Sequence, residues 1–320
     1  MRKTSFLIIL VLAFSAAAQS PEPDAFQETV EVDLVDLYFT ATDSKGRFIN
    51  DLTADEITVK EDGAPQDVLR FGAFAGERNE IPVLLSLLID NSASMDEEIQ
   101  EVRKLDLARD ASLVLLDQLG PLDRSMVVRF SDKPVYSELT SDKEAVGAIL
   151  KSMKPYWWHT ALFDATASTI TTLSKHSGRK ILLLCSDGQD NMSETKLEDL
   201  LKIATDSPEL TIVVFGTVSN RPARSMRGGV KDIPASPMFH GKEVLQQLAD
   251  TTAGYAFFPN NLKEADKVFE LIRSFVRSQY YLAYRPQNRT MDGAFRKIQL
   301  VCKRKGVTLH YRPGYNAPRS

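Results

Sequence analysis

Residues 83–94 read VLLSLLIDNSAS, and the first seven form a nearly continuous apolar run. Such a run is expected of a central strand that is covered on both faces of its sheet. Further strand-like runs follow, with segments of helical periodicity between them. The strands are expected at 126–130, 181–185 and 211–215, and the helices at 105–119, 143–152, 161–173, 197–205, 242–249 and 262–278. Strands that alternate with helices predict an α/β fold with a doubly wound, mostly parallel sheet.

Both flanks of this segment read as strands. On the N-terminal side, 29–42 alternates apolar and polar residues, and 57–60 and 67–71 flank a turn at 61–65. On the C-terminal side, strands are expected at 279–284, 295–303 and 307–312, with hairpin turns at 292–293 and 305–306. Each flank alone is a partial sheet with exposed edges, so we expect the two to form one β-sandwich. The expected divisions are 1–18, 19–78 (N-terminal strands), 79–278 (α/β domain) and 279–320 (C-terminal strands).

The first eighteen residues have the layout of a secretory signal peptide. Arg2 and Lys3 precede an apolar run at 6–14, and small residues follow up to an expected cleavage after Ala18. No later segment has the roughly 18 uncharged apolar residues that a membrane span needs. We therefore expect a mature protein without a transmembrane segment that is secreted or periplasmic.

Composition narrows the class of protein further. The 320 residues include 39 Lys and Arg against 43 Asp and Glu, a formal charge of −4, and 43% are hydrophobic. That hydrophobic share is typical of a globular chain, and the near-neutral charge argues against nucleic-acid binding. Cys185 and Cys302 both lie on strand-like apolar patterns. We expect two free, buried thiols, although a bridge between them stays open.

Oxygen-bearing side chains follow the ends of the predicted strands. Asp90, Ser92 and Ser94 come directly after the first central strand, Thr160 opens a helix, and Asp187 follows the strand that ends at Cys185. Ligands of open parallel sheets bind beyond the carboxyl ends of the strands. Hard oxygen donors suit Mg²⁺, with Mn²⁺ or Ca²⁺ as alternatives. A simpler interpretation of the serine pair is that it caps a helix.

Three segments together resemble a known site. DNSASM at 90–95, TALFDA at 160–165 and SDGQDN at 186–191 resemble the metal-ion-dependent adhesion site of von Willebrand factor type A domains, as in integrin I domains. That resemblance covers about 81–277. The flanking patterns at 52–56, 61–66, 280–286, 295–298 and 313–315 resemble those of secreted von Willebrand factor type A-related proteins common in acidobacteria.

The resemblance implies a role for each matching residue. Ser92 and Ser94 would ligate the cation through their hydroxyls, Thr160 would join them when a partner is engaged, and Asp90 and Asp187 would act through bound waters. Asp164 and Asp190 are left out of the metal shell, as a helix-start acid and a turn residue. Neutral hydroxyls leave much of the cation's charge unquenched. An open coordination position would therefore attract an Asp or Glu carboxylate from a protein partner.

The sequence departs from the family pattern just before Thr160, where a glycine is usual. Here 156–159 reads YWWH, and both tryptophans of the protein lie in it. One interpretation is that Trp157, Trp158 and His159 form a rim that binds the partner, because tryptophan and tyrosine are enriched in interface hot spots. The other is that the tryptophans pack against a neighbouring segment.

The expected function is that of an exported binding module and not of an enzyme. A structural envelope component with a bracing metal site is the first alternative. A hydrolase is a weaker one, with Ser92 or Ser94 as nucleophile, His159 as base and Asp187 orienting it. The chain has no Gly-x-Ser-x-Gly elbow, no phosphate-binding Gly-x-x-x-x-Gly-Lys-Ser/Thr loop and only four histidines.

Overall fold

The computed structural model describes residues 34–73, 82–156, 159–217 and 238–319. The predicted signal peptide, a loop expected at 221–237, and Trp157 and Trp158 of the predicted rim lie outside the described residues. Within residues 33–320, which form one compact unit, the chain builds an α/β part and a pair of antiparallel sheets.

The α/β part is built on one six-stranded sheet with the strand order β12-β11-β10-β5-β8-β9. The strands are β5 (Val83–Asp90), β8 (Arg124–Phe130), β9 (Pro134–Tyr136), β10 (Arg179–Ser186), β11 (Leu210–Gly216) and β12 (Ala256–Phe257). Every pairing is parallel except that of the edge strand β9 with β8. All residues of β5, β10 and β11 are buried, which explains their continuous apolar sequences.

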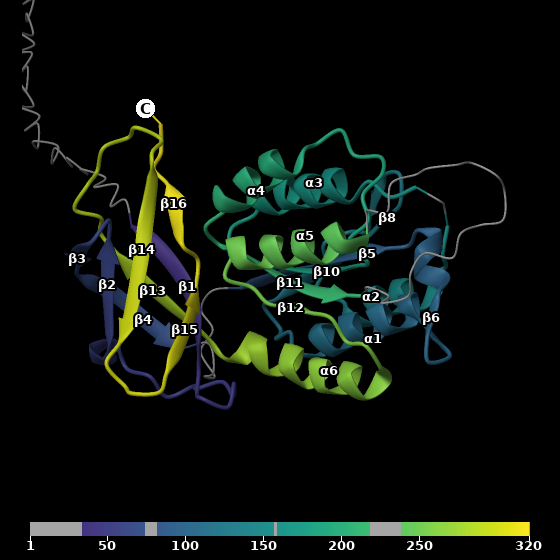
Figure 1. Ribbon diagram of the computed structural model, residues 1–320, viewed down its shortest axis with the longest axis horizontal. Helices are drawn as coiled ribbons and strands as arrows, with labels where there is room; N and C mark the ends of the chain where they lie inside the picture. The colour runs from purple at the N-terminus through teal and green to yellow at the C-terminus, as the bar shows by residue number, and fades with distance from the viewer. Residues whose placement is uncertain (1–33, 74–81, 157–158, 218–237, 320) are drawn as a thin grey trace, which may run out of the picture. The chain divides into compact units, whose positions relative to one another are not determined.

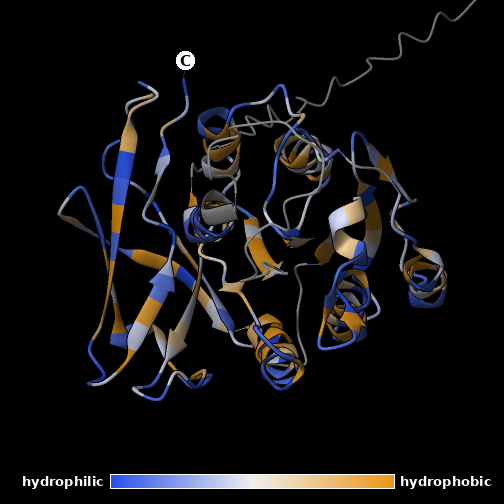
Figure 2. Ribbon diagram, turned by 45° about the vertical axis from the view of Figure 1, so that its right-hand side comes forward, coloured by the Kyte–Doolittle hydropathy of each residue, from blue (hydrophilic) through white to orange (hydrophobic). Residues whose placement is uncertain are grey.

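Helices cover both faces of this sheet (Figure 1). One face carries α1 (Lys104–Asp117), α2 (Lys143–Ser152) and α6 (Leu262–Arg277), and the other carries α3 (Leu162–Ser174), α4 (Leu197–Thr205) and α5 (Met238–Thr251). Alternate residues of β5 enter the two cores: Leu85 and Leu87 face α1, whereas Leu84 and Leu88 face α3. Hydrophobic strands surrounded by helices of mixed polarity are visible in Figure 2. The predicted doubly wound α/β fold is confirmed.

The flanking strands form two four-stranded antiparallel sheets. One has the order β15-β1-β13-β4, from β15 (Thr308–Tyr311), β1 (Val35–Thr42), β13 (Gln279–Tyr284) and β4 (Val68–Ala73). The other has the order β16-β14-β2-β3, from β16 (Gly314–Asn316), β14 (Phe295–Cys302), β2 (Ile57–Glu61) and β3 (Ala64–Gln66). Side chains from both sheets share one core, including Phe39, Val59, Tyr280 and Leu300. The predicted sandwich of N- and C-terminal strands is therefore present.

The two hairpins predicted at 292–293 and 305–306 are wrong. β13 pairs with β1 and β4, whereas β14 pairs with β2 and β16, and β15 returns to β1. Each of these turns therefore carries the chain from one sheet to the other. The N-terminal strands occupy the neighbouring positions that a hairpin partner would take.

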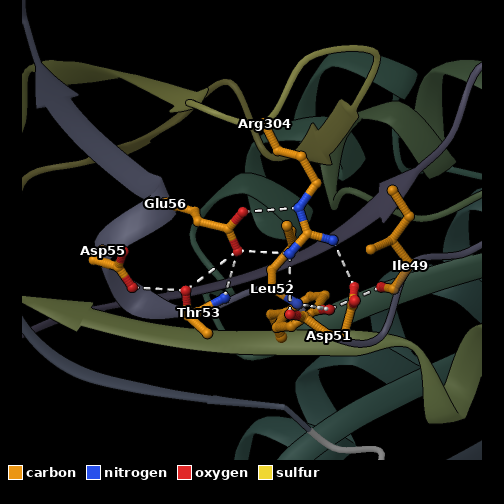
Figure 3. A network of polar contacts seen from close by, with 8 residues as sticks. Ile49, Asp51, Leu52, Thr53, Asp55, Glu56 and Arg304 are labelled. Atoms are coloured by element: carbon orange, nitrogen blue, oxygen red, sulfur yellow. Dashed lines mark hydrogen bonds and ion pairs between the residues drawn. The ribbon is translucent and has the colours of Figure 1, made fainter.

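An ion-pair network fixes the turn after β14 to the N-terminal segment (Figure 3). Arg304 donates from Nε to Glu56 Oε1 at 2.8 Å, from Nη2 to Glu56 Oε2 at 2.7 Å and from Nη1 to Asp51 Oδ1 at 2.6 Å. Glu56 also accepts from the Thr53 backbone at 3.0 Å, which caps the short 3₁₀ helix η1 (Ala54–Glu56). The hydrogen bonds from Arg304 lower the pKa of Glu56 to about 2.

The two cysteines are both free, but their burial differs. Cys185 lies fully buried on β10, whereas Cys302, at the end of β14, is only partly buried. The prediction of two buried thiols is thus correct for Cys185 alone. Cys302 is the last residue of its strand, where it packs against the sandwich core but is only partly covered.

Candidate functional site

Asp90 is the last residue of β5, and its side chain is fully buried. Its two carboxylate oxygens are held from two directions. The Ser92 backbone donates to Oδ1 at 2.9 Å, and the Ser186 hydroxyl, at the end of the neighbouring strand β10, donates to Oδ2 at 2.8 Å. The fold therefore fixes the carboxylate at the carboxyl end of two adjacent parallel strands.

Ser92 and Ser94 lie in the turn that follows. Their hydroxyl oxygens are 3.1 Å apart, and Ser92 is 1% exposed. Ser92 occupies the N-cap position of the 3₁₀ helix η2 (Ala93–Asp96), but its side chain makes no capping hydrogen bond. The helix-capping interpretation of Ser92 is therefore wrong: its hydroxyl is directed to Ser94 instead.

Asp187 follows β10 directly and is 5% exposed. Its Oδ1 accepts from the Gln189 backbone at 3.2 Å, whereas Oδ2 is buried and has no hydrogen-bond partner among the described residues. The Lys104 ammonium lies 3.6 Å from Oδ2, close enough for an ion pair but long for a hydrogen bond. A second acid with an unsatisfied oxygen thus lies near Asp90.

Thr160 is joined to this region through the backbone. Its N–H donates to Asn191 Oδ1 at 2.9 Å, and its carbonyl accepts from the Asn191 N–H at 3.0 Å. The next residue, Ala161, donates its N–H to the Ser131 carbonyl, directly after β8. The buried Thr160 therefore lies between the end of β8 and the loop that follows Asp187.

The two acids that the sequence left outside the metal shell hold loops together. Asp190 accepts from the Phe163 backbone at 2.9 Å and from the Ser193 hydroxyl at 2.6 Å. Asp164 accepts from the backbones of Glu194 and Thr195 at 3.0 and 2.8 Å. These bonds connect the start of α3 to the loop after β10.

Of the predicted partner-binding rim, only His159 is described, and it is exposed. The preceding loop is attached to the first segment, because the Tyr156 N–H donates to the Asn91 carbonyl at 2.7 Å. The rim stays a prediction.

The electrostatics of the site are those of two neighbouring buried acids. Burial raises the pKa of Asp90, and repulsion by the nearby Asp187 carboxylate raises it further. A buried carboxylate oxygen that accepts no hydrogen bond among the described residues, near a second buried acid and two hydroxyls, fits a hard divalent ion. No cluster of three or more His, Cys, Asp or Glu suited to a metal is found in the described part of the chain. Asp90, Ser92, Ser94 and Asp187 thus lie in one region, and the mixed hydroxyl and carboxylate donor set stays a prediction.

Three further residues belong to this site and were assigned no role from the sequence. Ser186 orients Asp90, Asn191 orients Thr160, and Lys104 faces Asp187. Ser186 and Asn191 lie inside the SDGQDN segment, so their position in the motif was a usable signal. Lys104 opens α1 and lies outside all three segments in the sequence, and nothing in its local sequence indicates that it is buried.

The geometry defines an α/β domain with an oxygen-lined site at the carboxyl edge of its sheet. The model of the von Willebrand factor type A domain matches residues 85–189, from β5 to the loop that carries Asp187. The chain therefore contains a von Willebrand factor type A domain.

Solved structures with some similarity to the chain come from several bacteria. They include the conserved hypothetical protein BatB of Bacteroides thetaiotaomicron (19% identity, 61% of this chain and 98% of that chain, TM-score 0.45). Another is a von Willebrand factor type A protein of Catenulispora acidiphila (15% identity, 91% of this chain and 75% of that chain, TM-score 0.47). A third is the PilB minor pilin of Streptococcus sanguinis (12% identity, 63% of this chain and 63% of that chain, TM-score 0.47). No curated protein matches the chain.

Proposed function

We propose that this protein is an exported binding module that captures a protein partner through a divalent cation, most simply Mg²⁺. Asp90, Ser92, Ser94, Thr160 and Asp187 would hold the cation, and a partner's Asp or Glu carboxylate would complete its coordination. The observation that carries the proposal is the pair of buried acids Asp90 and Asp187, one with an unsatisfied oxygen, beside two touching hydroxyls.

The chemistry of the donors favours binding over catalysis. A bound cation would supply a concentrated positive charge. Ser92 and Ser94 are neutral, so they would leave that charge available to an incoming carboxylate. Asp90, held by Ser186 and the Ser92 backbone, is pre-oriented and needs little rearrangement. The proposal of export rests on the leader-like sequence at 1–18. Within the described residues, no helix has the length and apolar character needed to cross a membrane.

Titration calorimetry with Mn²⁺ and Mg²⁺ tests the cation site directly. The wild-type chain should take up one ion, and Asp90→Asn and the double variant Ser92→Ala/Ser94→Ala should lose at least about tenfold in affinity. Asp266→Asn is the matched control, because Asp266 is an exposed acid on α6. Equal affinity in all four proteins, or no uptake by the wild type, would refute the site.

Capture experiments test the partner. Immobilised protein should retain envelope proteins in Mn²⁺ and release them in chelator, and Asp90→Asn should retain none. An extract whose carboxylates have been converted to amides should not be retained. Metal uptake that raises thermal stability without any carboxylate-dependent capture would favour the bracing role of a structural envelope component instead.

A further inference from the structure

A lysine lies buried beside the acids of the proposed cation site. Lys104 is 2% exposed, although lysine is among the residues least often buried without a partner. Its ammonium is shared between two carboxylates. Nζ lies 2.7 Å from Glu97 Oε2 and 3.6 Å from Asp187 Oδ2. The first carboxylate is 61% exposed and the second only 3%, so Lys104 connects the rim of the site to its buried floor.

A small hairpin sets this position. Glu97 and Lys104 flank the two-stranded ribbon of β6 (Glu98–Ile99) and β7 (Val102–Arg103), and the Lys104 N–H donates to the Glu97 carbonyl at 2.9 Å. The turn residues Gln100 and Glu101 have φ of 52° and 69°, which closes the ribbon tightly. Lys104 is also the first residue of α1, which packs on β5 and β10. The ammonium is therefore held by the fold and is not a free surface charge.

Lys104 supplies the positive charge that the cation would otherwise supply. Asp187 Oδ2 accepts no hydrogen bond among the described residues, so the ammonium is the charge that compensates it. A divalent ion serving the same carboxylate would meet a like charge a few ångströms away. Glu97 offers the ammonium a shorter contact on the solvent side.

We propose that Lys104 is a built-in competitor of the divalent cation for Asp187. This inference rests on the proposed function and adds its regulation. Without metal, Lys104 neutralises Asp187 and keeps the site folded. When the cation binds, the ammonium is left to Glu97. The competition sets the cation affinity below what the oxygen donors alone would give.

Charge variants of the pair should shift Mn²⁺ affinity in opposite directions. Lys104→Met removes the competitor and should tighten Mn²⁺ binding by about tenfold or more, the size expected when a charge within a few ångströms is removed. Glu97→Gln removes the ammonium's second partner, confines it to Asp187 and should weaken Mn²⁺ binding. Glu98→Gln, which removes a neighbouring carboxylate that is also exposed, is the control and should change affinity little. Glu97 is exposed, so its variant should fold even if Lys104→Met does not.

A second measurement needs no metal. In chelator, unfolding of Lys104→Met, Asp187→Asn and the double variant should reveal coupling, because Asp187→Asn removes the charge that Lys104→Met leaves unpaired. Additive effects would overturn the proposal, as would unchanged or weaker Mn²⁺ binding in Lys104→Met, or unchanged or tighter binding in Glu97→Gln. If the wild type binds Mn²⁺ and these variants do not shift its affinity, only the role of Lys104 fails. If neither the wild type nor Lys104→Met binds Mn²⁺, the proposed function fails with it.

Discussion

At the scale of single residues, the site depends on a hydroxyl that is not among its proposed ligands. Ser186 donates to Asp90 Oδ2 at 2.8 Å and accepts from the Gly188 N–H at 3.0 Å, and its side chain is fully buried. One hydroxyl thus orients the acid at the end of β5 and shapes the turn at the end of β10.

We predict that Ser186→Ala lowers the free energy of unfolding by about 1–3 kcal/mol, because a buried carboxylate and a buried N–H each lose a partner. Urea unfolding in chelator measures this loss. Ser112→Ala is the matched control: its hydroxyl is equally buried but donates to the Ala108 carbonyl within α1, so its removal should cost less. Equal losses in the two variants would contradict the role assigned to Ser186.

The residues that the sequence predicted and those that it missed differ in a physical way. Asp90, Ser92 and Ser94 lie on one short run at the end of a strand, so local spacing alone brings them together. Lys104 is buried where the hairpin before it and helix α1 bring its ammonium to Asp187, a residue 83 positions later in the chain, and that tertiary contact leaves no local mark in the sequence. In the sequence, Arg103 and Lys104 have the composition of a solvated helix start.

At the scale of elements, the loop after β10 and helix α5 approach each other more closely than side chains allow. Gly188 has φ of +79°, and a Cβ added to it would lie 2.5 Å from the Gly241 carbonyl oxygen. A Cβ on Gly241 would in turn lie 2.9 Å from the Asp187 carbonyl oxygen. The position of Asp187 is therefore set partly by backbone contact with α5.

We predict that Gly188→Ala lowers the free energy of unfolding by about 2 kcal/mol or more, from the left-handed backbone and the steric contact together. Gly46→Ala separates the two causes. Gly46 has a similar φ of +74° but nothing within 4 Å of an added Cβ, so it should show only the smaller backbone cost. Urea unfolding measures both losses. Equal losses would mean that α5 shifts to accommodate the added Cβ at little cost in free energy, which would contradict the steric part of the prediction. The Gly188 variant should also bind Mn²⁺ more weakly.

The type of each helix or strand could be predicted from its periodicity. Which strands pair with each other could be predicted only where the chain offered a single possible partner. The helices at 143–152 and 197–205 were predicted at their observed bounds, because each has a clear apolar face. The short strands β9, β12 and β16 were missed, since two or three residues carry no periodicity. The hairpin turns were mistaken because the competing partners of β13 and β14 lie more than two hundred residues earlier in the chain.

At the scale of the whole described chain, N-terminal and C-terminal strands together make up each of the two antiparallel sheets. β1 lies between β13 and β15, and β2 lies between β14 and β3, so neither sheet is complete until the last strands are present. Such long-range pairings are slow to form, because the chain loses the entropy of closing a long loop before the stabilising contacts are made. The sandwich as a whole was predictable, because each flank had too few strands to close alone.

Contacts also join the sandwich to the α/β part. The Thr40 and Tyr255 hydroxyls are 2.8 Å apart, and His310 Nε2 lies 2.6 Å from the Gly254 carbonyl oxygen. Arg312, buried to 3% exposure, donates to the carbonyls of Ala204 and Ser207 at the end of α4. These contacts connect the last strands to the helical layer, so the sandwich and the α/β part should unfold together.

The pH dependence of stability at Glu56 tests the ion pair with Arg304 that joins the N-terminal segment to the turn after β14. Its pKa falls from the ordinary value of 4.5 to about 2 because of the hydrogen bonds from Arg304. Between these two values the unfolded chain binds more protons at this site than the folded chain. The contribution of Glu56 to stability is therefore complete above about pH 4.5, and it disappears as the pH falls toward 2.

We predict that Glu56→Gln is less stable than the wild type at neutral pH and that the gap narrows as the pH falls through this window. Urea midpoints measured from neutral pH down to about pH 2.5 give the difference at each pH, which cancels the other acids that titrate in both proteins. Glu138→Gln, a change at an exposed acid after β9, should show a small, pH-independent difference. A gap between Glu56→Gln and the wild type that stays constant across the window would mean that Arg304 does not hold Glu56 ionised in solution. The turn after β14 would then be attached to the N-terminal segment by packing and backbone contacts, such as the bond from the Lys303 N–H to the Glu56 carbonyl at 2.9 Å.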